Sequence, residues 1–269
     1  MGKYLVMGLA IAFSAFAARA EVVRTLVPNP HRPTQIALTF DACEAWERVS
    51  FDRKILDYLV QNQIPTTIFV TGRFARDNAN DLQALSKLPF VEIANHSWSH
   101  PNTMDRMALD KVKAEVTRAE DEVLNVTGRK PSPYFRFPAG VYDSDTLSAV
   151  EELGYQVVHW RWAVGDPDRS MTATKIRARV AAQTKPNDIL IFHINGRGWH
   201  TGEALPEVIA DLRAKGFQFV TLSEGLGGAE HQAARKPSDR FVATNPFDRI
   251  MRWAVNRLLF PASENRKDR

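Results

Sequence analysis

Two histidines lie four residues apart in the segment His96-Ser97-Trp98-Ser99-His100. A single helical turn at this spacing would point both imidazoles toward the same ion, and imidazole nitrogen is a common ligand of zinc. Pro101 follows directly and stops any longer helix. No glutamate stands between the two histidines, so the general base of a hydrolytic reaction must come from elsewhere in the chain. Two histidines alone are more often structural than metal-binding.

Further ionisable residues stand where predicted strands end, and their types suit acid and base chemistry. In parallel α/β barrels, active sites are built at the carboxyl ends of the strands. We therefore expect these residues and the two histidines to converge on one rim. The residues are Asp41 at the end of the first strand, Arg136 at the end of the fourth, Asp166 after the fifth and His193 at the end of the sixth.

The elements that would position these side chains alternate between residues 36 and 221. Short β-branched runs predict seven strands, at 36–41, 66–70, 91–95, 134–136, 156–159, 189–192 and 218–221. Amphipathic patterns predict helices at 51–62, 77–86, 108–126, 145–152, 174–182 and 204–215. Alternating strands and helices are typical of an α/β protein with a parallel sheet. Seven strands are enough to close a barrel, or nearly so.

The composition is that of an ordinary globular protein. Of 269 residues, 44% are hydrophobic, and 35 Lys and Arg stand against 31 Asp and Glu. These values exclude a disordered, collagen-like or disulfide-stapled chain. The formal charge of +4 comes with no basic cluster between the two ends, so no nucleic-acid partner is expected. The single cysteine, Cys43, has no disulfide partner within the chain.

Residues 1–20 have the pattern of a secretory signal peptide. Lys3 precedes an apolar run at 4–17, and Ala18-Arg19-Ala20 form an A-x-A cleavage site ahead of Glu21. A retained membrane anchor is the alternative, but the run is shorter than the roughly 20 apolar residues that span a bilayer. We therefore expect removal of the signal peptide and export to the periplasm or the extracellular space.

Residues 227–269 lie outside the repeating pattern of strands and helices. A polar stretch follows Gly227, and an amphipathic helix is expected within residues 247–260. Such a stripe usually packs on its parent domain, so membrane contact through this tail is not expected. The mature chain is thus divided into an N-terminal lead at 21–33, a main domain at 34–226 and this C-terminal tail. The oligomeric state is not indicated by the sequence.

Four motifs follow one another along the chain: Thr39-Phe40-Asp41, Asn95-His96-Ser97-Trp98-Ser99-His100-Pro101, Arg136-Phe137-Pro138-Ala139-Gly140 and Ile189-Leu190-Ile191-Phe192-His193. Together they resemble the ordered motifs of the polysaccharide deacetylases, carbohydrate esterase family 4, also called the NodB-homology domain. The resemblance covers about residues 34 to 226, and four motifs in order are far more specific than any one of them. It implies a distorted (β/α)7 barrel and metal-dependent hydrolysis of N-acetyl, sometimes O-acetyl, groups on glycans.

The resemblance implies a role for each matching residue, beginning with the metal and the base. His96 and His100 match the two metal-binding imidazoles, and zinc is the ion we expect. Asp41 matches the general base, which takes a proton from the attacking water. Arg136 matches the residue that holds this carboxylate, a task that suits its planar guanidinium.

Three further residues match the family at the remaining steps of the reaction. The backbone N–H of Ala139 matches the donor of a hydrogen bond to the tetrahedral oxyanion. His193 matches the general acid that protonates the leaving sugar amine. Asp166 resembles the carboxylate that orients this imidazole, and a histidine paired with a carboxylate keeps its proton to higher pH, as a general acid must.

One position departs from the family's pattern. The usual first motif has two adjacent aspartates, of which the second binds the metal, and Ala42 occupies that position here. Asp52, at the start of the next predicted helix, is our preferred substitute because its carboxylate could swing back to the rim. Glu44 and Cys43 are nearer in sequence and chemically able, and a thiolate would favour zinc more strongly than a carboxylate. A site with no third protein ligand also stays open.

Trp98 and Trp199 lie close to motif residues, where an aromatic ring can stack on a sugar. Aromatic side chains belong to the core more often than to a binding surface. Trp199 stands in a Gly-rich segment directly after His193, and such a segment is expected to border the cleft. Both tryptophans are therefore candidate substrate-binding residues.

The function expected from these residues is that of an exported, metal-dependent hydrolase that removes acetyl groups, foremost N-acetyl, from a polysaccharide. A metal-free glycan-binding pseudoenzyme on the same fold is the alternative, because Ala42 removes a metal ligand. A mere binder would have no chemical use for the full set of acid, base and orienting residues. A barrel hydrolase of another kind, such as a metallopeptidase, lacks HExxH or any comparable motif.

Overall fold

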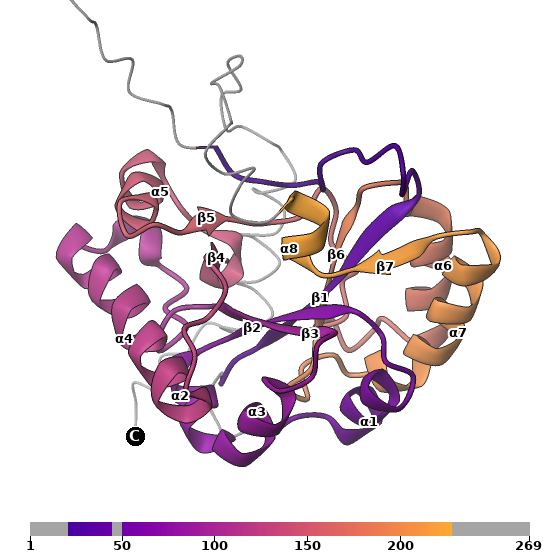
Figure 1. The fold of residues 1–269 in the computed structure, drawn as a ribbon, viewed down its shortest axis with the longest axis horizontal. Coiled ribbons are helices and arrows are strands. Elements are labelled where there is room, and N and C mark those ends of the chain that lie inside the picture. Colours follow the sequence, from indigo (N-terminus) through magenta and orange to yellow (C-terminus); the bar gives the residue numbers. More distant parts are fainter. Residues whose placement is uncertain (1–20, 45–49, 228–269) are drawn as a thin grey trace, which may run out of the picture.

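The computed structural model describes residues 21–44 and 50–227 of the chain (Figure 1). The predicted signal peptide at 1–20 and the predicted amphipathic helix at 247–260 lie outside the described residues. Among the helices that are described, none is both long enough and apolar enough to cross a membrane.

Seven parallel strands of the described chain form one sheet that curls into a distorted barrel (Figure 1). Their order is β5-β4-β3-β2-β1-β6, and β7 pairs with the start of β1. All seven lie where the sequence predicts strands, which confirms the α/β class and the (β/α)7 barrel. The strands are β1 (Gln35–Ala42), β2 (Thr66–Val70), β3 (Val91–Asn95), β4 (Tyr134–Phe135), β5 (Gln156–Val157), β6 (Ile189–His193) and β7 (Gln218–Val220).

Side chains alternate between the two faces of each strand, and one set fills the barrel interior. This interior cluster takes an apolar residue from each strand or its end, namely Ala37, Phe69, Ala94, Tyr134, Val158, Ile189 and Val220. Positions two or four residues further along β1, β3 and β6 keep the same inward face, and they hold Asp41, His96 and His193. The same alternation that fills the core therefore points these three side chains inward at the carboxyl end of the barrel.

The N-terminal lead closes part of the gap between β5 and β6. Val23 forms a parallel bridge with Val158, and Thr25 forms an antiparallel bridge with Asp188, the residue before β6. The backbone N–H of Val23 donates to the carbonyl of Val157 at 2.9 Å. Because the lead supplies the missing hydrogen-bond partners here, it belongs structurally to the barrel.

Helix α4 (Leu109–Thr127) confirms the clearest helical prediction. Its buried residues are Val112, Val116, Ala119 and Val123, four of the five residues on the predicted face, while Leu109 is 43% exposed. Gly128 ends the helix in the left-handed region, with φ of 73°, and donates its N–H to the carbonyl of Leu124 at 2.8 Å. A residue with a Cβ would be strained at this position.

The remaining helices differ from the predictions mainly at their ends. The helix predicted at 77–86 is α3, and a helix that was not predicted, α2, precedes it and meets it at Asn78. Helix α7 begins at Thr201, three residues earlier than predicted. The remaining helices are α1 (Arg53–Gln61), α2 (Gly72–Asp77), α3 (Ala79–Leu85), α5 (Ser144–Glu151), α6 (Ala173–Gln183), α7 (Thr201–Ala214) and α8 (Leu222–Leu226), with short 3-10 turns at Met104–Arg106 and Pro138–Gly140.

Candidate active site

Asp41 and Arg136 form a buried ion pair at the carboxyl end of the barrel. Nη1 of Arg136 donates to Oδ1 of Asp41 at 2.7 Å, and Nη2 donates to the Thr39 hydroxyl at 2.9 Å. Nε donates to the carbonyl of Val158 at 3.2 Å, and the guanidinium carbon lies 4.0 Å from the centre of the Phe69 ring. With donors used on three sides, Arg136 holds one carboxylate oxygen of Asp41 in a fixed position.

The other carboxylate oxygen of Asp41 faces the two histidines. Oδ2 lies 3.5 Å from Nε2 of His96. Burial opposes ionisation of Asp41, but the charge of Arg136 and its hydrogen bond to the carboxylate favour it, and the pKa of this carboxyl lies below its usual value. Asp41 is therefore a carboxylate near neutral pH, in the protonation state that a general base needs.

His96 and His100 present free imidazole nitrogens to a common space. Nδ1 of His96 donates to the carbonyl of Arg136 at 2.8 Å, because a carbonyl only accepts. Nε2 of His96 is then unprotonated, and it is buried with no hydrogen-bond partner. Burial lowers the pKa of His96 and lowers that of His100 well below its usual value. Two neutral imidazoles are the form that binds a metal.

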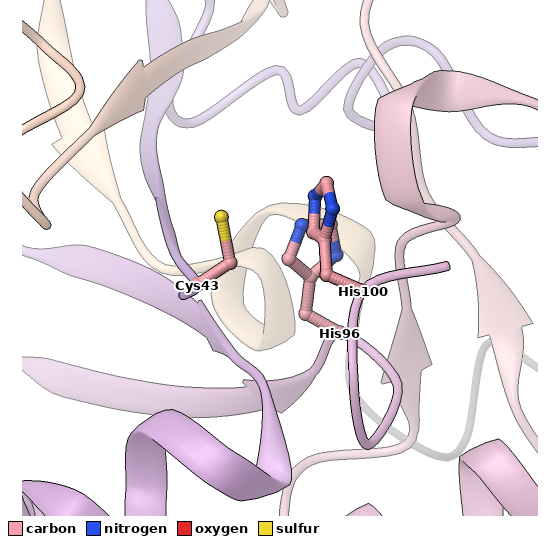
Figure 2. A group of neighbouring side chains, drawn as sticks. All are labelled: Cys43, His96 and His100. Atoms are coloured by element: carbon pink, nitrogen blue, oxygen red, sulfur yellow. The ribbon is translucent and has the colours of Figure 1, made fainter. Parts of the chain in front are cut away.

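The third member of this group is Cys43. Its sulfur and the imidazole nitrogens of His96 and His100 all lie within 4.8 Å of one another, and Figure 2 shows the three side chains pointing in the same direction. Cys43 is a buried, free cysteine. Burial raises the pKa of its thiol to about 12, although the charge of Arg197 acts in the opposite sense. Without a cation beside it, the thiol stays protonated.

The two histidines come together through a tight loop and not through the helical turn that their spacing suggested. Ser97 and His100 both have positive φ, of 71° and 55°. The N–H of Ser97 donates to Oδ1 of Asn95 at 2.9 Å, and the N–H of His100 donates to the Ser97 hydroxyl at 3.1 Å. Polar side chains therefore stabilise an otherwise unfavourable backbone that places both rings on one side.

The structure corrects the preference for Asp52 as third ligand. Oδ1 of Asp52 accepts the backbone N–H of Lys54 at 2.9 Å, so the carboxylate caps α1. Among the described residues, only Cys43 joins the two histidines to form a metal-ligating group. Glu44 also lies apart from them: partial burial and a hydrogen bond to Asp77 raise the pKa of its carboxyl to about 7.

His193 and Asp166 form a second pair beside the first. Nδ1 of His193 lies 3.0 Å from Oδ1 of Asp166, and because a carboxylate only accepts, Nδ1 carries the proton. Oδ2 of Asp166 accepts the backbone N–H of His193 at 2.7 Å and the Thr201 hydroxyl at 2.8 Å. Asp166 therefore fixes both the tautomer and the orientation of the His193 ring, in which Nε2 is left available for proton transfer.

Thr201 and Gly198 are residues of this site that the sequence analysis missed. A Cβ at Gly198 would lie 2.4 Å from the Thr201 hydroxyl and 2.7 Å from Oδ2 of Asp166. Only glycine therefore lets the loop after β6 pass this close to the carboxylate. The signal was present in the Gly-rich segment after His193, but the helix was predicted to begin at 204 and not at Thr201.

Ala139 has the left-handed backbone that glycine normally adopts, with φ of 53° and ψ of 13°. Its N–H makes no hydrogen bond to another described residue, whereas the N–H groups of Gly140 and Val141 are both used within the turn. An alanine held in this strained region leaves a free, fixed donor at the end of β4. Such a donor can stabilise negative charge on a substrate oxygen.

The two candidate tryptophans differ sharply in exposure. Trp98 is only 8% exposed; its ring packs against Gly72, and the guanidinium of Arg118 covers it at 4.4 Å. The structure therefore corrects the expectation that Trp98 contacts substrate. Trp199 is 46% exposed and donates its indole N–H to the carbonyl of Pro167 at 3.0 Å, so its ring lies on the surface beside the loop that carries Asp166.

The site thus brings a buried carboxylate and a carboxylate-paired histidine together on neighbouring strands, beside a group that could hold a metal. Comparison with known proteins points to one class. The family model described as "Polysaccharide deacetylase" matches residues 29–158. The peptidoglycan-N-acetylmuramic acid deacetylase PdaA of Bacillus subtilis (strain 168) is 31% identical over 191 residues, which is 70% of each chain. Its solved structure, a family 4 carbohydrate esterase, matches with a TM-score of 0.65 and 27% identity, over 76% of this chain and 84% of that chain.

Two further proteins are similar to this chain, one in sequence and one in fold. A peptidoglycan-N-acetylglucosamine deacetylase of Bacillus cereus is 29% identical over 197 residues, covering 72% of this chain and 69% of the relative. A solved family 4 pseudoenzyme from Bacillus anthracis matches in fold, with a TM-score of 0.66 and 20% identity over 77% of this chain and 69% of that chain. The chain belongs to the polysaccharide deacetylase family, carbohydrate esterase family 4, and is a hydrolase of that class.

Proposed function

We propose that this protein is an exported, metal-dependent deacetylase that removes N-acetyl groups from a glycan of the peptidoglycan type. The observation that carries the proposal is the unpartnered Nε2 of buried, neutral His96, with the Asp41–Arg136 and His193–Asp166 pairs on neighbouring strands. The substrate class rests on the relatives, two of which are named as peptidoglycan deacetylases.

The donor set at the site fits a divalent metal. A buried imidazole nitrogen with no partner is costly unless an ion or a proton occupies it, and burial already disfavours the proton on His96 and His100. His96 and His100 would hold the ion, and zinc suits nitrogen ligands. A bound divalent ion polarises the acetyl carbonyl and lowers the pKa of water toward about 7.

Asp41 and Arg136 carry the first half of the reaction. Asp41 takes the proton as the water oxygen forms a bond to the acetyl carbon, and Arg136 keeps the carboxylate aimed through the 2.7 Å contact to Oδ1. The N–H of Ala139 donates a hydrogen bond to the oxygen on which negative charge develops, and one such donor contributes roughly 3 kcal/mol to transition-state stabilisation.

His193 carries the second half. It gives a proton to the sugar nitrogen as the bond from that nitrogen to the acetyl carbon breaks, so that acetate and a free amine leave. Asp166 and Thr201 hold the imidazole for this step through the contacts to both carboxylate oxygens. Trp199, exposed beside the Asp166 loop, offers a surface on which a sugar ring stacks.

Export is supported by two observations. Residues 1–20 have the charged start, apolar run and A-x-A site of a signal peptide. The named relatives act on peptidoglycan, a glycan that lies outside the cytoplasmic membrane. We place the protein in the periplasm or the extracellular space, with 34–226 as the catalytic domain.

Acetate release tests this function. The chain lacking only residues 1–20 is incubated with peptidoglycan, chitooligosaccharides and an O-acetylated xylan, as purified, after chelation and after zinc is restored. We expect release from peptidoglycan that chelation abolishes and zinc recovers. Release from the O-acetylated polymer alone would overturn the substrate class. No release from any polymer by folded, zinc-loaded protein would overturn the enzyme proposal in favour of a glycan-binding pseudoenzyme.

A further inference from the structure

We propose that the Cys43 thiolate replaces the missing second aspartate as the third protein ligand of the metal. The inference rests on the proposed function, because it concerns the ion that His96 and His100 would hold. Ala42 occupies the position of the usual carboxylate, and its methyl group offers no ligand atom. Cys43, one residue further along the chain, is the residue that the fold brings to the two histidines.

The distances suit such a group after a small closure. The three donor atoms lie within 4.8 Å of one another. A tetrahedral zinc with bonds of about 2.0–2.1 Å to nitrogen and 2.3 Å to sulfur sets its ligand atoms roughly 3.3–3.6 Å apart. Side-chain movements of about 1 Å would therefore bring the three donor atoms to these separations.

One buried side chain beside Cys43 can donate a hydrogen bond to its sulfur. Asn195 is wholly buried just after β6, and its amide nitrogen lies 3.4 Å from the Cys43 sulfur. The same amide nitrogen also donates to the backbone carbonyl of Cys43, so Asn195 holds the residue at two points. A buried N–H donor aimed at sulfur stabilises a thiolate more than a neutral thiol, because the charged acceptor makes the stronger hydrogen bond.

The nearby carboxylates have other partners. Asp41 gives one oxygen to Arg136, Asp52 caps α1, and Glu44 hydrogen-bonds Asp77. A thiolate with two imidazoles selects softer ions such as zinc and cobalt over magnesium and manganese, which prefer oxygen ligands. The chain would thus keep the family's reaction while its metal site differs in chemical character.

Cobalt substitution gives a direct readout of sulfur ligation. The full chain without residues 1–20 is loaded with one equivalent of Co²⁺, and its absorption is recorded in the near ultraviolet, where thiolate-to-cobalt charge transfer appears. We expect this band in the wild type and its loss in Cys43→Ser. Zinc affinity of Cys43→Ser, measured by competition with a chelator, should fall by about 100-fold or more, since even outer partners of metal ligands are worth 10–100-fold.

Two further variants separate ligand loss from misfolding. Cys43→Asp should bind one zinc without the charge-transfer band, because it restores a carboxylate close to the family's position. Asp52→Asn is the matched control: asparagine also caps a helix, so zinc affinity and the cobalt band should match the wild type. Circular dichroism and thermal unfolding confirm that each variant is folded.

The outcomes distinguish this inference from the proposed function. A wild type that binds one cobalt without the band, or a Cys43→Ser variant with unchanged zinc affinity, overturns the role of Cys43. A protein that binds no ion overturns it as well. Zinc-dependent acetate release without the charge-transfer band would support the deacetylase function and exclude only Cys43 as a ligand. The charge-transfer band without acetate release would support Cys43 as a ligand and exclude the deacetylase activity.

Discussion

The two acid–base pairs of the site sit on neighbouring strands but are supported by different parts of the molecule. Asp41 and His193 are register partners across β1 and β6. The partner of Asp41 is Arg136, which Thr39 on β1 holds in turn through its hydroxyl, and the ion pair is buried on both sides. The partner of His193 is Asp166, which lies in a loop and is held in turn by Thr201 at the start of α7, and the His193 side chain is 15% exposed.

Because of this difference, we expect substitutions on the two sides to affect stability and catalysis in different proportions. The Asp41 side extends the core, so its residues contribute to the fold and to the reaction together. On the other side, His193 ends β6 with a partly exposed side chain and its partner Asp166 comes from a loop, so we expect a change of His193 to affect the fold less. An acid that must reach the leaving nitrogen needs an open position, whereas a base that must stay ionised is served by a fixed, buried partner.

The largest expected effect is on turnover in Asp41→Asn. The variant keeps the shape and an acceptor for Arg136 but loses the ability to take a proton, so we expect kcat to fall by about 10³-fold. Acetate release and zinc content are measured on the same sample, and zinc content should match the wild type. Turnover within tenfold of the wild type would remove Asp41 as the base.

Replacement of Arg136 tests whether the Asp41 side supports the fold. Arg136→Met leaves the Asp41 carboxylate buried without its partner, and breaking one side of a buried pair costs about 3–5 kcal/mol of unfolding free energy. Chemical denaturation of the metal-free protein measures this loss. The double variant with Asp41→Asn should recover part of it; equal stability of the single variant and the wild type would show that the ion pair is not structural.

His193→Gln should give the opposite profile. Loss of the general acid lowers kcat by about 100-fold, with KM nearly unchanged. The unfolding free energy should stay within about 1 kcal/mol of the wild type, because the ring is partly exposed and the glutamine amide can still donate a hydrogen bond to Asp166. A stability loss as large as that of Arg136→Met would contradict the contrast between the two sides.

The residues that the structure brings together in this site could largely be predicted from the sequence, because most of them lie at or just after the ends of strands. Asp41, His96 and His193 follow β-branched runs whose alternation sets their direction, and such runs are visible in a sequence. Asp52 shows the limit of this reasoning. An aspartate just before a helix can be a helix cap or a metal ligand, and the sequence does not distinguish the two roles. Cys43 could not be ranked above Asp52, because the distance from β1 to the histidine loop is a tertiary property.

Other features lie beyond sequence patterns for the same reason. The left-handed residues Ser97 and His100 bring two imidazoles together without the helical turn that their spacing suggests. Trp98 and Trp199 have the same chemistry, and both lie near motifs. A guanidinium lies over each ring, Arg118 over Trp98 and Arg169 over Trp199. Even so, Trp98 is 8% exposed and Trp199 is 46% exposed. Burial of a single aromatic ring depends on which helix packs over it, and local sequence does not encode that.

The pH dependence of stability offers a finer test of the buried side. His159 is buried next to the Asp41–Arg136 pair, and burial, with the charges of Arg24 and Arg136, lowers its pKa well below the usual value. Below about pH 6.5 the unfolded chain binds a proton that the folded chain does not, so the unfolding free energy decreases as pH falls, by up to about 1.4 kcal/mol per pH unit for this residue. Above that pH both states are neutral and the contribution is constant.

Denaturation of His159→Gln and wild type between pH 7 and pH 5, both metal-free, measures this slope. The variant should lose stability less steeply, because glutamine does not titrate, while His96 and His100 contribute equally to both proteins. Identical slopes would mean that His159 is protonated in the folded protein.

The smallest effect is expected on the open side, at Trp199. Stacking of a sugar on an exposed indole contributes roughly 1 kcal/mol, so Trp199→Ala should raise KM about fivefold while kcat changes little. Trp199→Phe keeps an aromatic ring, so its KM should lie between those of the wild type and Trp199→Ala. Kinetics on the best glycan of the panel measure both constants, and thermal unfolding should be close to the wild type because the ring is outside the core. An unchanged KM would show that the exposed ring takes no part in binding, and that the His193 side contributes proton transfer without substrate contact from this loop.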